Sequence, residues 1–155
     1  MTGKIDARLK SLGLALPAAP APVANYVPYV RTGNLVFVSG QIPLENGAIK
    51  YVGRVGSEVT PEHAYEAAKL CALNLIAQAK AACGGDLDRV TRVVKLTAFV
   101  AAGPEFADHP TVANGASDLM VRVFGEAGRH CRAAVGASSL PRGAAVEVEA
   151  VFEVA

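Results

Sequence analysis

Apolar and polar residues alternate along the end of the chain. Between positions 146 and 154 the apolar residues are Val146, Val148, Ala150, Phe152 and Val154, and glutamates stand at 147, 149 and 153. A period of two is typical of a strand with one buried face. A further strand is expected at 132–138, where Ala133, Val135 and Ala137 share one side. Residues 140–143 (LPRG) are expected to connect these two strands.

Three earlier segments also show strand patterns. Residues 34–39 (NLVFVS) carry four successive apolar residues, which is typical of a strand buried on both faces. Gly33-Asn34 and Asn46-Gly47 are turn signals on either side. A short strand is expected at 48–55, and a β-branched run predicts another at 89–100.

Helical patterns separate these strands. Thr60-Pro61-Glu62 has the composition of a helix start, and alanines recur at three- and four-residue steps until Gly84-Gly85. A second helix is expected at about 111–124, and a short amphipathic one at 4–12. Residues 14–25 contain Pro17, Pro20 and Pro22, which favour an extended arm packed on the surface. We therefore expect an N-terminal helix and arm over 1–25 and one domain over 26–155.

The order of these elements predicts an α+β fold. A mixed sheet of about six strands carries two main helices, and two helices cover only one face of such a sheet. The other face keeps apolar residues from 34–39 and 89–100. Association with identical subunits is the natural way to bury them.

Composition narrows the class of function. The 155 residues carry a net charge of +1, and 19% of them are charged. Such a balance gives no electrostatic attraction to nucleic acid or to an anionic membrane. No uncharged apolar run reaches the roughly 18–20 residues of a membrane span, and charges between Lys4 and Lys10 interrupt any signal peptide. We expect a soluble, cytoplasmic protein with no nucleic-acid or membrane partner.

Cysteine and histidine give no sign of a metal site. The cysteines at 71, 83 and 131 are odd in number and form no CxxC pair, which favours reduced thiols. The histidines at 63, 109 and 130 are scattered along the chain and form no metal-ligand motif. We therefore expect no metal site built from these residues.

Three segments together resemble one known family. They are Ser39–Pro43 (SGQIP), Val94–Val100 followed by Thr111–Asn114, and Arg132–Val135 followed by Leu140-Pro141 and Val146–Glu149. In this order and spacing they resemble the RidA/YjgF family, also called endoribonuclease L-PSP, over about residues 26–154. The resemblance implies a chorismate-mutase-like fold, a homotrimer, and ligand clefts between neighbouring subunits. It also implies hydrolysis of 2-imino and enamine acids to 2-oxo acids and ammonia without a cofactor, as in 2-iminobutanoate/2-iminopropanoate deaminases.

Arg132 matches the substrate-binding arginine of that family. A 2-imino acid carries a carboxylate beside its C=N bond, and a guanidinium holds a carboxylate with two parallel hydrogen bonds. The alternative is an ordinary solvated arginine at a sheet edge. The surrounding motif favours the substrate-binding role.

Glu147 matches the family's acidic residue, which is proposed to activate the attacking water. The alternative is an outward-facing strand residue like Glu149 or Glu153. If 139–145 closed an antiparallel hairpin, Arg132 would lie opposite about 150–152 and not opposite Glu147. A shared site would then form diagonally or across an interface.

Four further residues are candidate substrate contacts. Gly40 allows close approach of a ligand, and Ser39 offers a hydroxyl. Asn114 matches a cleft asparagine, and Tyr29 a cleft tyrosine, for which Tyr26 is an equal candidate. The alternatives are turn chemistry for Ser39 and Gly40 and a helix cap for Asn114.

One departure from the family opens a second hypothesis. Many of its deaminases have a cysteine two residues after the arginine, where this chain has Ala134. The chain is either a 2-imino acid hydrolase or a non-catalytic oligomer that binds small carboxylates such as 2-oxo acids. Ribonuclease activity is disfavoured by the near-zero net charge and the lack of basic or aromatic stacking segments.

Overall fold

The computed structural model describes residues 2–21 and 24–155, and Pro22 of the predicted arm lies outside them. The main sheet has five strands in the order β1-β2-β7-β5-β6. They are β1 (Tyr29–Thr32), β2 (Leu35–Gln41), β7 (Val146–Val154), β5 (Val90–Ala101) and β6 (Cys131–Ala137). Neighbouring strands are antiparallel except β5 and β6, which are parallel. The predicted α+β class with a mixed sheet is confirmed.

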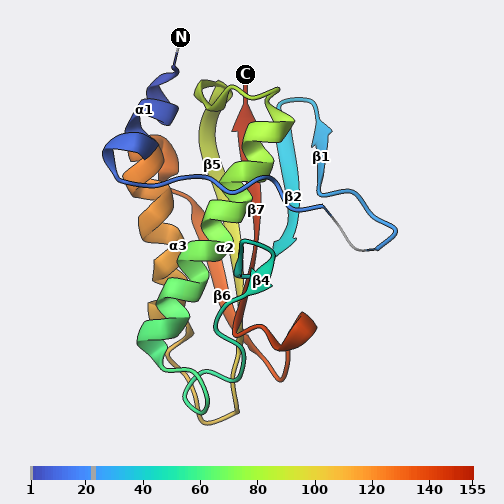
Figure 1. Cartoon of the computed structure of the whole chain (residues 1–155), viewed down its shortest axis with the longest axis vertical. Helices are drawn as coiled ribbons and strands as arrows, with labels where there is room; N and C mark the ends of the chain where they lie inside the picture. Colours follow the sequence, from blue (N-terminus) through green and yellow to red (C-terminus); the bar gives the residue numbers. More distant parts are fainter. Residues whose placement is uncertain (1, 22–23) are drawn as a thin grey trace.

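Two helices cover one face of this sheet (Figure 1). Helix α2 (Pro61–Ala82) begins where predicted, because the Thr60 side chain accepts a hydrogen bond from the His63 N–H at 3.1 Å. It ends at Ala82, just before Gly84 and Gly85, which both have positive φ. Helix α3 (His109–Phe124) begins two residues before the predicted position 111.

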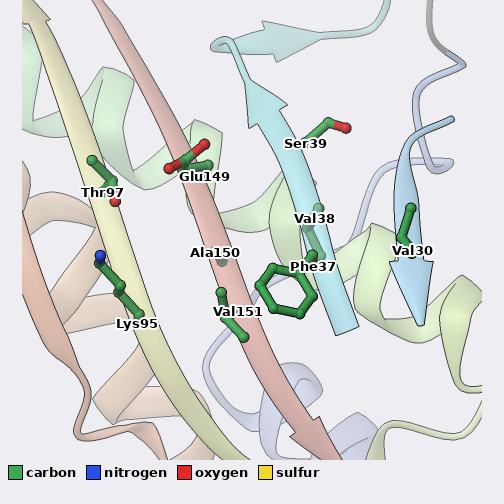
Figure 2. Close-up of a pocket in the computed structure, with 9 residues that line it drawn as sticks. All are labelled: Val30, Phe37, Val38, Ser39, Lys95, Thr97, Glu149, Ala150 and Val151. Carbon is green, nitrogen blue, oxygen red and sulfur yellow. The ribbon is translucent and has the colours of Figure 1, made fainter. Parts of the chain in front are cut away.

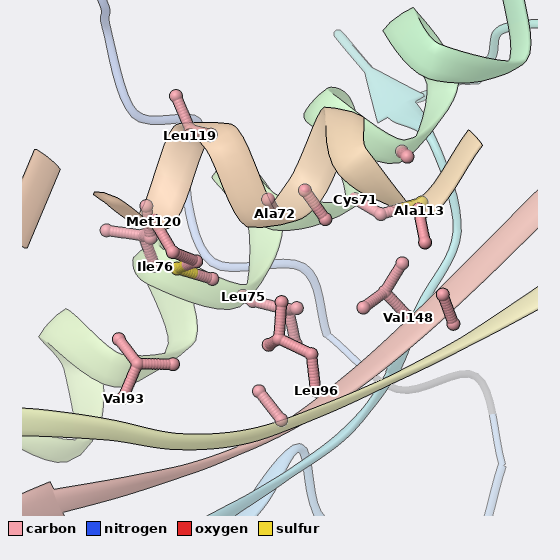
Figure 3. Close-up of a cluster of buried hydrophobic side chains, with 14 of the residues drawn as sticks. Cys71, Ala72, Leu75, Ile76, Val93, Leu96, Ala113, Leu119, Met120 and Val148 are labelled. Carbon is pink, nitrogen blue, oxygen red and sulfur yellow. The ribbon is translucent and has the colours of Figure 1, made fainter. Parts of the chain in front are cut away.

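The core fills the space between these helices and the sheet (Figure 3). Its largest buried side chains come from α2, α3 and the central strands, among them Leu75, Ile76, Leu119, Met120 and Leu96. The alanine seam of α2 lets α3 approach closely, and a Cβ on Gly115 would overlap the Tyr65 carbonyl oxygen. Small residues therefore set the spacing of the two helices.

The N-terminal segment packs against this layer. Helix α1 (Lys4–Ser11) is tied to the short helix η1 (Leu87–Arg89), because Asp88 accepts hydrogen bonds from the N–H groups of Lys4 and Ile5 at 2.8 and 2.9 Å. In the described part of the arm, Leu14 and Leu16 pack against the core, and no helix or strand forms between residues 14 and 21. These two leucines hold the segment against the folded domain.

The predicted strand at 48–55 is wrong in extent. Only β4 (Ala48–Ile49) is extended, and it pairs with β3 (Leu44–Glu45) in a separate two-stranded sheet. Tyr51 and Gly53 adopt φ values of 60° and 124°, which interrupt an extended backbone. The segment therefore adds no sixth strand to the main sheet.

A hairpin between β6 and β7 is also wrong. Strand β5 lies between them, and the connection passes through the short helix η3 (Pro141–Gly143). Strand β7 takes the central place because its whole helix-facing side is buried, whereas β6 stays at the edge. Arg132 therefore pairs with Leu96 and not with the 150–152 segment.

The second face of the sheet is open in the single chain. Val36 and Val38 of β2 are buried beneath the helices, but Phe37 between them is 46% exposed. The prediction that residues 34–39 are buried on both faces holds on one face only. Among the described residues, no helix is both long and apolar enough to span a membrane.

Candidate functional site

Arg132 lies on the helix-covered side of the edge strand β6. Its register partner is Leu96, which is buried in the core, so the Arg132 side chain extends toward α3. There it meets Asn114 and Ser117 of α3, and Ser117 in turn contacts His130. We call Arg132, Asn114, Ser117 and His130 the Arg132 cluster.

Two acceptors hold one end of the guanidinium. Arg132 Nη1 donates to Asn114 Oδ1 at 2.8 Å and to Ser117 Oγ at 3.1 Å. Nη1 carries two hydrogens, so both are engaged. Nε and Nη2 have no hydrogen-bond partner among residues 2–21 and 24–155.

The guanidinium has no anionic partner in the described part of the chain. The ion pairs there join Lys80 to Asp6 and Arg129 to Glu126, and neither involves Arg132. The Arg132 residue is half-buried, which places a positive charge in a partly desolvated position. A charge held this way favours binding of a small anion.

His130 forms the back of the Arg132 cluster. Its Nδ1 lies 2.7 Å from the Gly128 carbonyl oxygen, and its Nε2 lies 2.8 Å from Ser117 Oγ. Burial lowers the pKa of His130 below its ordinary value; the hydrogen bond to the Gly128 carbonyl opposes this in part, and the positive charge of Arg132 adds to the lowering. The neutral imidazole is therefore favoured.

Glu147 lies on the other face of the sheet. Its neighbours Val146 and Val148 are buried beneath the helices, so the alternation of β7 directs Glu147 to the open face. Its carboxylate lies over Gly40, where a Cβ would overlap Oε1. The register between β2 and β7 shifts between Val38 and Gln41, which brings Gly40 to this place.

A cavity of about 190 Å³ surrounds the Glu147 carboxylate. We call it the Glu147 pocket; its polar lining comes from Gln41, Arg142 and Glu147, and its other lining residues are Pro20, Ala21, Tyr26, Pro28, Gly40, Ile42, Leu44 and Pro141. Burial raises the pKa of Glu147 above its usual range, and the charge of Glu149 raises it further. A carboxylate with a raised pKa is a stronger base at neutral pH.

Buried amides of α2 hold the walls of this pocket. Gln78 Nε2 donates to the Pro20 carbonyl at 2.6 Å, and Asn74 Nδ2 donates to the carbonyls of Ile42 and Leu44 at 3.1 and 3.2 Å. The N-terminal arm thus becomes part of the pocket. The sequence interpretation missed both amides, which lie on the helix among residues of the apolar seam.

The two candidate tyrosines separate in the structure. Tyr29 begins β1 opposite Val38 and packs against the core. Tyr26 is 52% exposed and lines the Glu147 pocket. The geometry favours Tyr26 over Tyr29 as a ligand contact.

Ser39 is part of a different hollow. Its hydroxyl donates to the Val27 carbonyl at 2.9 Å, which fastens the segment before β1. Ser39 also lines a hollow of about 410 Å³ on the open face of the sheet, together with Phe37, Lys95 and Glu149 (Figure 2). Phe37 and Val151 are register partners there, so apolar and charged side chains share the open face.

The structure therefore brings the predicted residues together in two groups. Arg132 and Asn114 meet on the helix side, whereas Glu147 and Gly40 meet on the open side. Ser117 was missed, although it stands three residues after Asn114 and therefore on the same face of α3. Ala134 lies two residues beyond Arg132 on β6 and packs a methyl group against the core.

Similarity to known proteins extends over nearly the whole chain. Residues 6–153 match the family described as "YjgF/chorismate mutase-like, putative endoribonuclease". Protein TCP17 of Trypanosoma cruzi is 50% identical over 153 residues, which cover 98% of this chain and 95% of that protein. The 2-iminobutanoate/2-iminopropanoate deaminase of Dermatophagoides farinae is 28% identical, covering 89% of this chain and 92% of that protein.

Solved structures give the same fold at two levels of likeness. The protein Atu1372 from Agrobacterium tumefaciens superposes with a TM-score of 0.92 at 52% identity, covering 97% of this chain and 92% of that one. RidA from an Antarctic Psychrobacter bacterium gives a TM-score of 0.62 at 28% identity, covering 88% of this chain and 94% of that one. The chain is more similar to Atu1372 than to that RidA protein.

Proposed function

Because this chain belongs to the YjgF/chorismate-mutase-like family, we propose that it hydrolyses 2-imino and enamine acids to 2-oxo acids and ammonia. The 28% identical relative from Dermatophagoides farinae is named for this reaction. In this proposal Arg132 holds the substrate carboxylate, and Glu147 directs the water.

The observation that carries the proposal is the unneutralised guanidinium of Arg132. Its Nη1 is fixed at 2.8 Å from Asn114 Oδ1 and 3.1 Å from Ser117 Oγ, while Nε and Nη2 are free of partners in the described chain. Two parallel N–H groups match the two oxygens of a carboxylate. A 2-imino acid bound there has its C=N carbon one bond from the anchored carboxylate.

Glu147 supplies the base. A water molecule adds to the C=N carbon while the carboxylate takes its proton and the imine nitrogen is protonated, giving a carbinolamine. The carbinolamine then loses ammonia as its hydroxyl proton departs, and the C=O of the 2-oxo acid forms. The raised pKa of Glu147 makes its carboxylate a stronger proton acceptor than an ordinary glutamate.

Both residues act on one substrate only if two copies of the chain meet. Arg132 and Glu147 lie on opposite faces of the same sheet. The open face carries exposed apolar side chains, including Val30, Phe37 and Val135. We propose that a homo-oligomer, with a trimer as the expected form, covers this face and joins the Arg132 cluster of one copy to the Glu147 pocket of the next.

One observation favours a second candidate function. The Arg132 cluster is complete without Glu147, and Ala134 replaces the thiol found in many family deaminases. A non-catalytic oligomer that binds 2-oxo acids needs only this cluster. Such a protein binds 2-oxobutanoate but releases no ammonia from imines.

Ammonia release from freshly generated 2-aminoacrylate tests the proposal. Arg132→Ala is expected to lower kcat/KM at least about 30-fold, because loss of a bidentate anchor removes about 2 kcal/mol or more. Arg132→Lys keeps the positive charge but loses the two parallel N–H donors, so it restores only part of the rate. Lys10→Ala, which removes a positive charge at an exposed position of α1, is the control and stays at the wild-type rate. A wild-type rate equal to that of buffer alone would end the hydrolase proposal.

A further inference from the structure

The hydrogen bonds behind Arg132 have a defined direction. The Gly128 carbonyl oxygen only accepts, so His130 Nδ1, at 2.7 Å, carries the hydrogen. In the neutral ring Nε2 is then an acceptor, and it lies 2.8 Å from Ser117 Oγ. The Ser117 hydroxyl hydrogen therefore points to His130, and its lone pairs face Arg132.

This direction determines what Ser117 offers to Arg132. With its hydrogen committed to His130, Ser117 Oγ is a fixed acceptor for Arg132 Nη1 at 3.1 Å. Asn114 Oδ1 accepts the other Nη1 hydrogen at 2.8 Å. Both hydrogens of Nη1 are thus consumed, and only the edge formed by Nε and Nη2 is left for a ligand.

We infer that Ser117 and His130 are positioning residues that decide which edge of Arg132 meets the substrate carboxylate. The inference rests on the proposed function for the identity of the ligand, a small 2-oxo or 2-imino acid. The carboxylate binds side-on, with one oxygen on Nε–H and the other on Nη2–H. The C=N group of the substrate then takes one orientation relative to the sheet, instead of the several that a freely rotating guanidinium allows.

Kinetics of ammonia release separate this role from a merely structural one. Ser117→Ala removes the acceptor, and His130→Phe keeps the ring size but removes both nitrogens. A lost hydrogen bond to a charged group is expected to raise KM about 5- to 30-fold, with kcat within about two-fold because the carboxylate stays bound through the reaction. Ser117→Thr keeps the hydroxyl and restores KM, and His63→Ala, at an exposed position of α2, leaves it unchanged.

Nitrogen NMR of the wild-type protein supplies a second readout. His130 is expected to show a protonated Nδ1 and an unprotonated Nε2, the reverse of the tautomer that dominates in free histidine. In Ser117→Ala the Nε2 resonance is expected to move, because its hydrogen-bond donor is gone. An Nε2-protonated ring in the wild type would overturn the inference.

Binding of 2-oxobutanoate, followed by calorimetry, keeps the two proposals apart. If the wild type releases no ammonia, the hydrolase proposal fails, and the ratio of 2-oxobutanoate dissociation constants between wild type and Ser117→Ala still tests the positioning role. The same 5- to 30-fold weakening, about 1–2 kcal/mol, supports it. Equal dissociation constants, or a loss in kcat and thermal stability with KM unchanged, would overturn it.

Discussion

The Arg132 cluster and the Glu147 pocket differ in how they treat a charged group. The first orients a guanidinium by hydrogen bonds, and the second changes the pKa of a carboxylate by burial. Arg132 is held by neutral acceptors, Asn114 and Ser117, that fix its orientation without cancelling its charge. Glu147 has no hydrogen-bond partner among the described residues; it is half-buried in the Glu147 pocket, and this burial raises its pKa. One region thus controls geometry, and the other controls proton affinity.

The sheet separates these two regions. Residues on β6 and β7 that face the helices cannot reach residues that face the open side, because side chains alternate across a strand. The Arg132 guanidinium and the Glu147 carboxylate form no ion pair in the described part of the chain. Their separation therefore keeps both reactive until a second copy brings them together, which is the arrangement that we propose.

The largest effect is expected when the carboxylate of Glu147 is removed and the size of its side chain is kept. Glu147→Gln is expected to lower kcat about 10²- to 10⁴-fold, the usual contribution of a positioned general base. Binding of 2-oxobutanoate is expected to stay near that of the wild type, because Arg132 and its partners are untouched. Ammonia-release kinetics and calorimetry on the same preparation measure the two effects. An unchanged kcat would remove Glu147 from the reaction and favour the binding function.

Mixing two inactive variants tests whether the regions meet between copies. Arg132→Ala keeps an intact Glu147 pocket, and Glu147→Gln keeps an intact Arg132 cluster. After denaturation and refolding together in equal amounts, random assembly gives about one quarter of clefts with both residues intact, and a corresponding recovery of rate. Each variant refolded alone is the control. No recovery in mixtures that do form mixed oligomers would contradict the shared cleft.

A smaller effect is expected from crowding the Glu147 carboxylate. Gly40→Ala places a Cβ where Glu147 Oε1 lies, so the carboxylate has to move away from its present position. A displaced catalytic group lowers the rate about 10- to 100-fold, while 2-oxobutanoate binding at Arg132 stays the same. Ammonia release and a thermal melt distinguish this from unfolding. A wild-type rate in Gly40→Ala would show that the close packing of residues 40 and 147 has no catalytic purpose.

The sequence predicted the fold well where one periodic pattern dominated. The alternation over 146–154 and the alanine seam after Thr60 each led to one element with correct faces. The segment 48–55 failed because positive φ at Tyr51 leaves no clear trace in the residue pattern. The pairing of β6 with β5 was missed because strand order depends on which strand buries its full length, a property of the whole sheet.

The residues of the candidate site were selected through the family resemblance rather than through local pattern. Arg132 and Asn114 meet as the resemblance implied, and Gly40 lies beneath Glu147. The alternation of side chains along β6 and β7 explains why Arg132 and Glu147 lie on opposite faces, but only when the strand order is known. Ser117 and Gln78 escaped notice because their roles come from hydrogen bonds to residues distant in sequence.

The smallest predicted effect concerns the proton affinity of Glu147. Burial and then the charge of Glu149 raise the pKa of Glu147. If the base form of Glu147 is required, the rate of ammonia release rises with pH through this pKa. Glu149→Gln removes the smaller cause, so the acid limb of the pH–rate profile is expected to move to lower pH and remain above the ordinary carboxyl range, because burial persists. Glu153→Gln, on the same strand but farther from Glu147, is the matched control and leaves the limb in place. A limb that moves to higher pH in Glu149→Gln would mean that another group titrates there, and that burial of Glu147 does not set the pH dependence of the reaction.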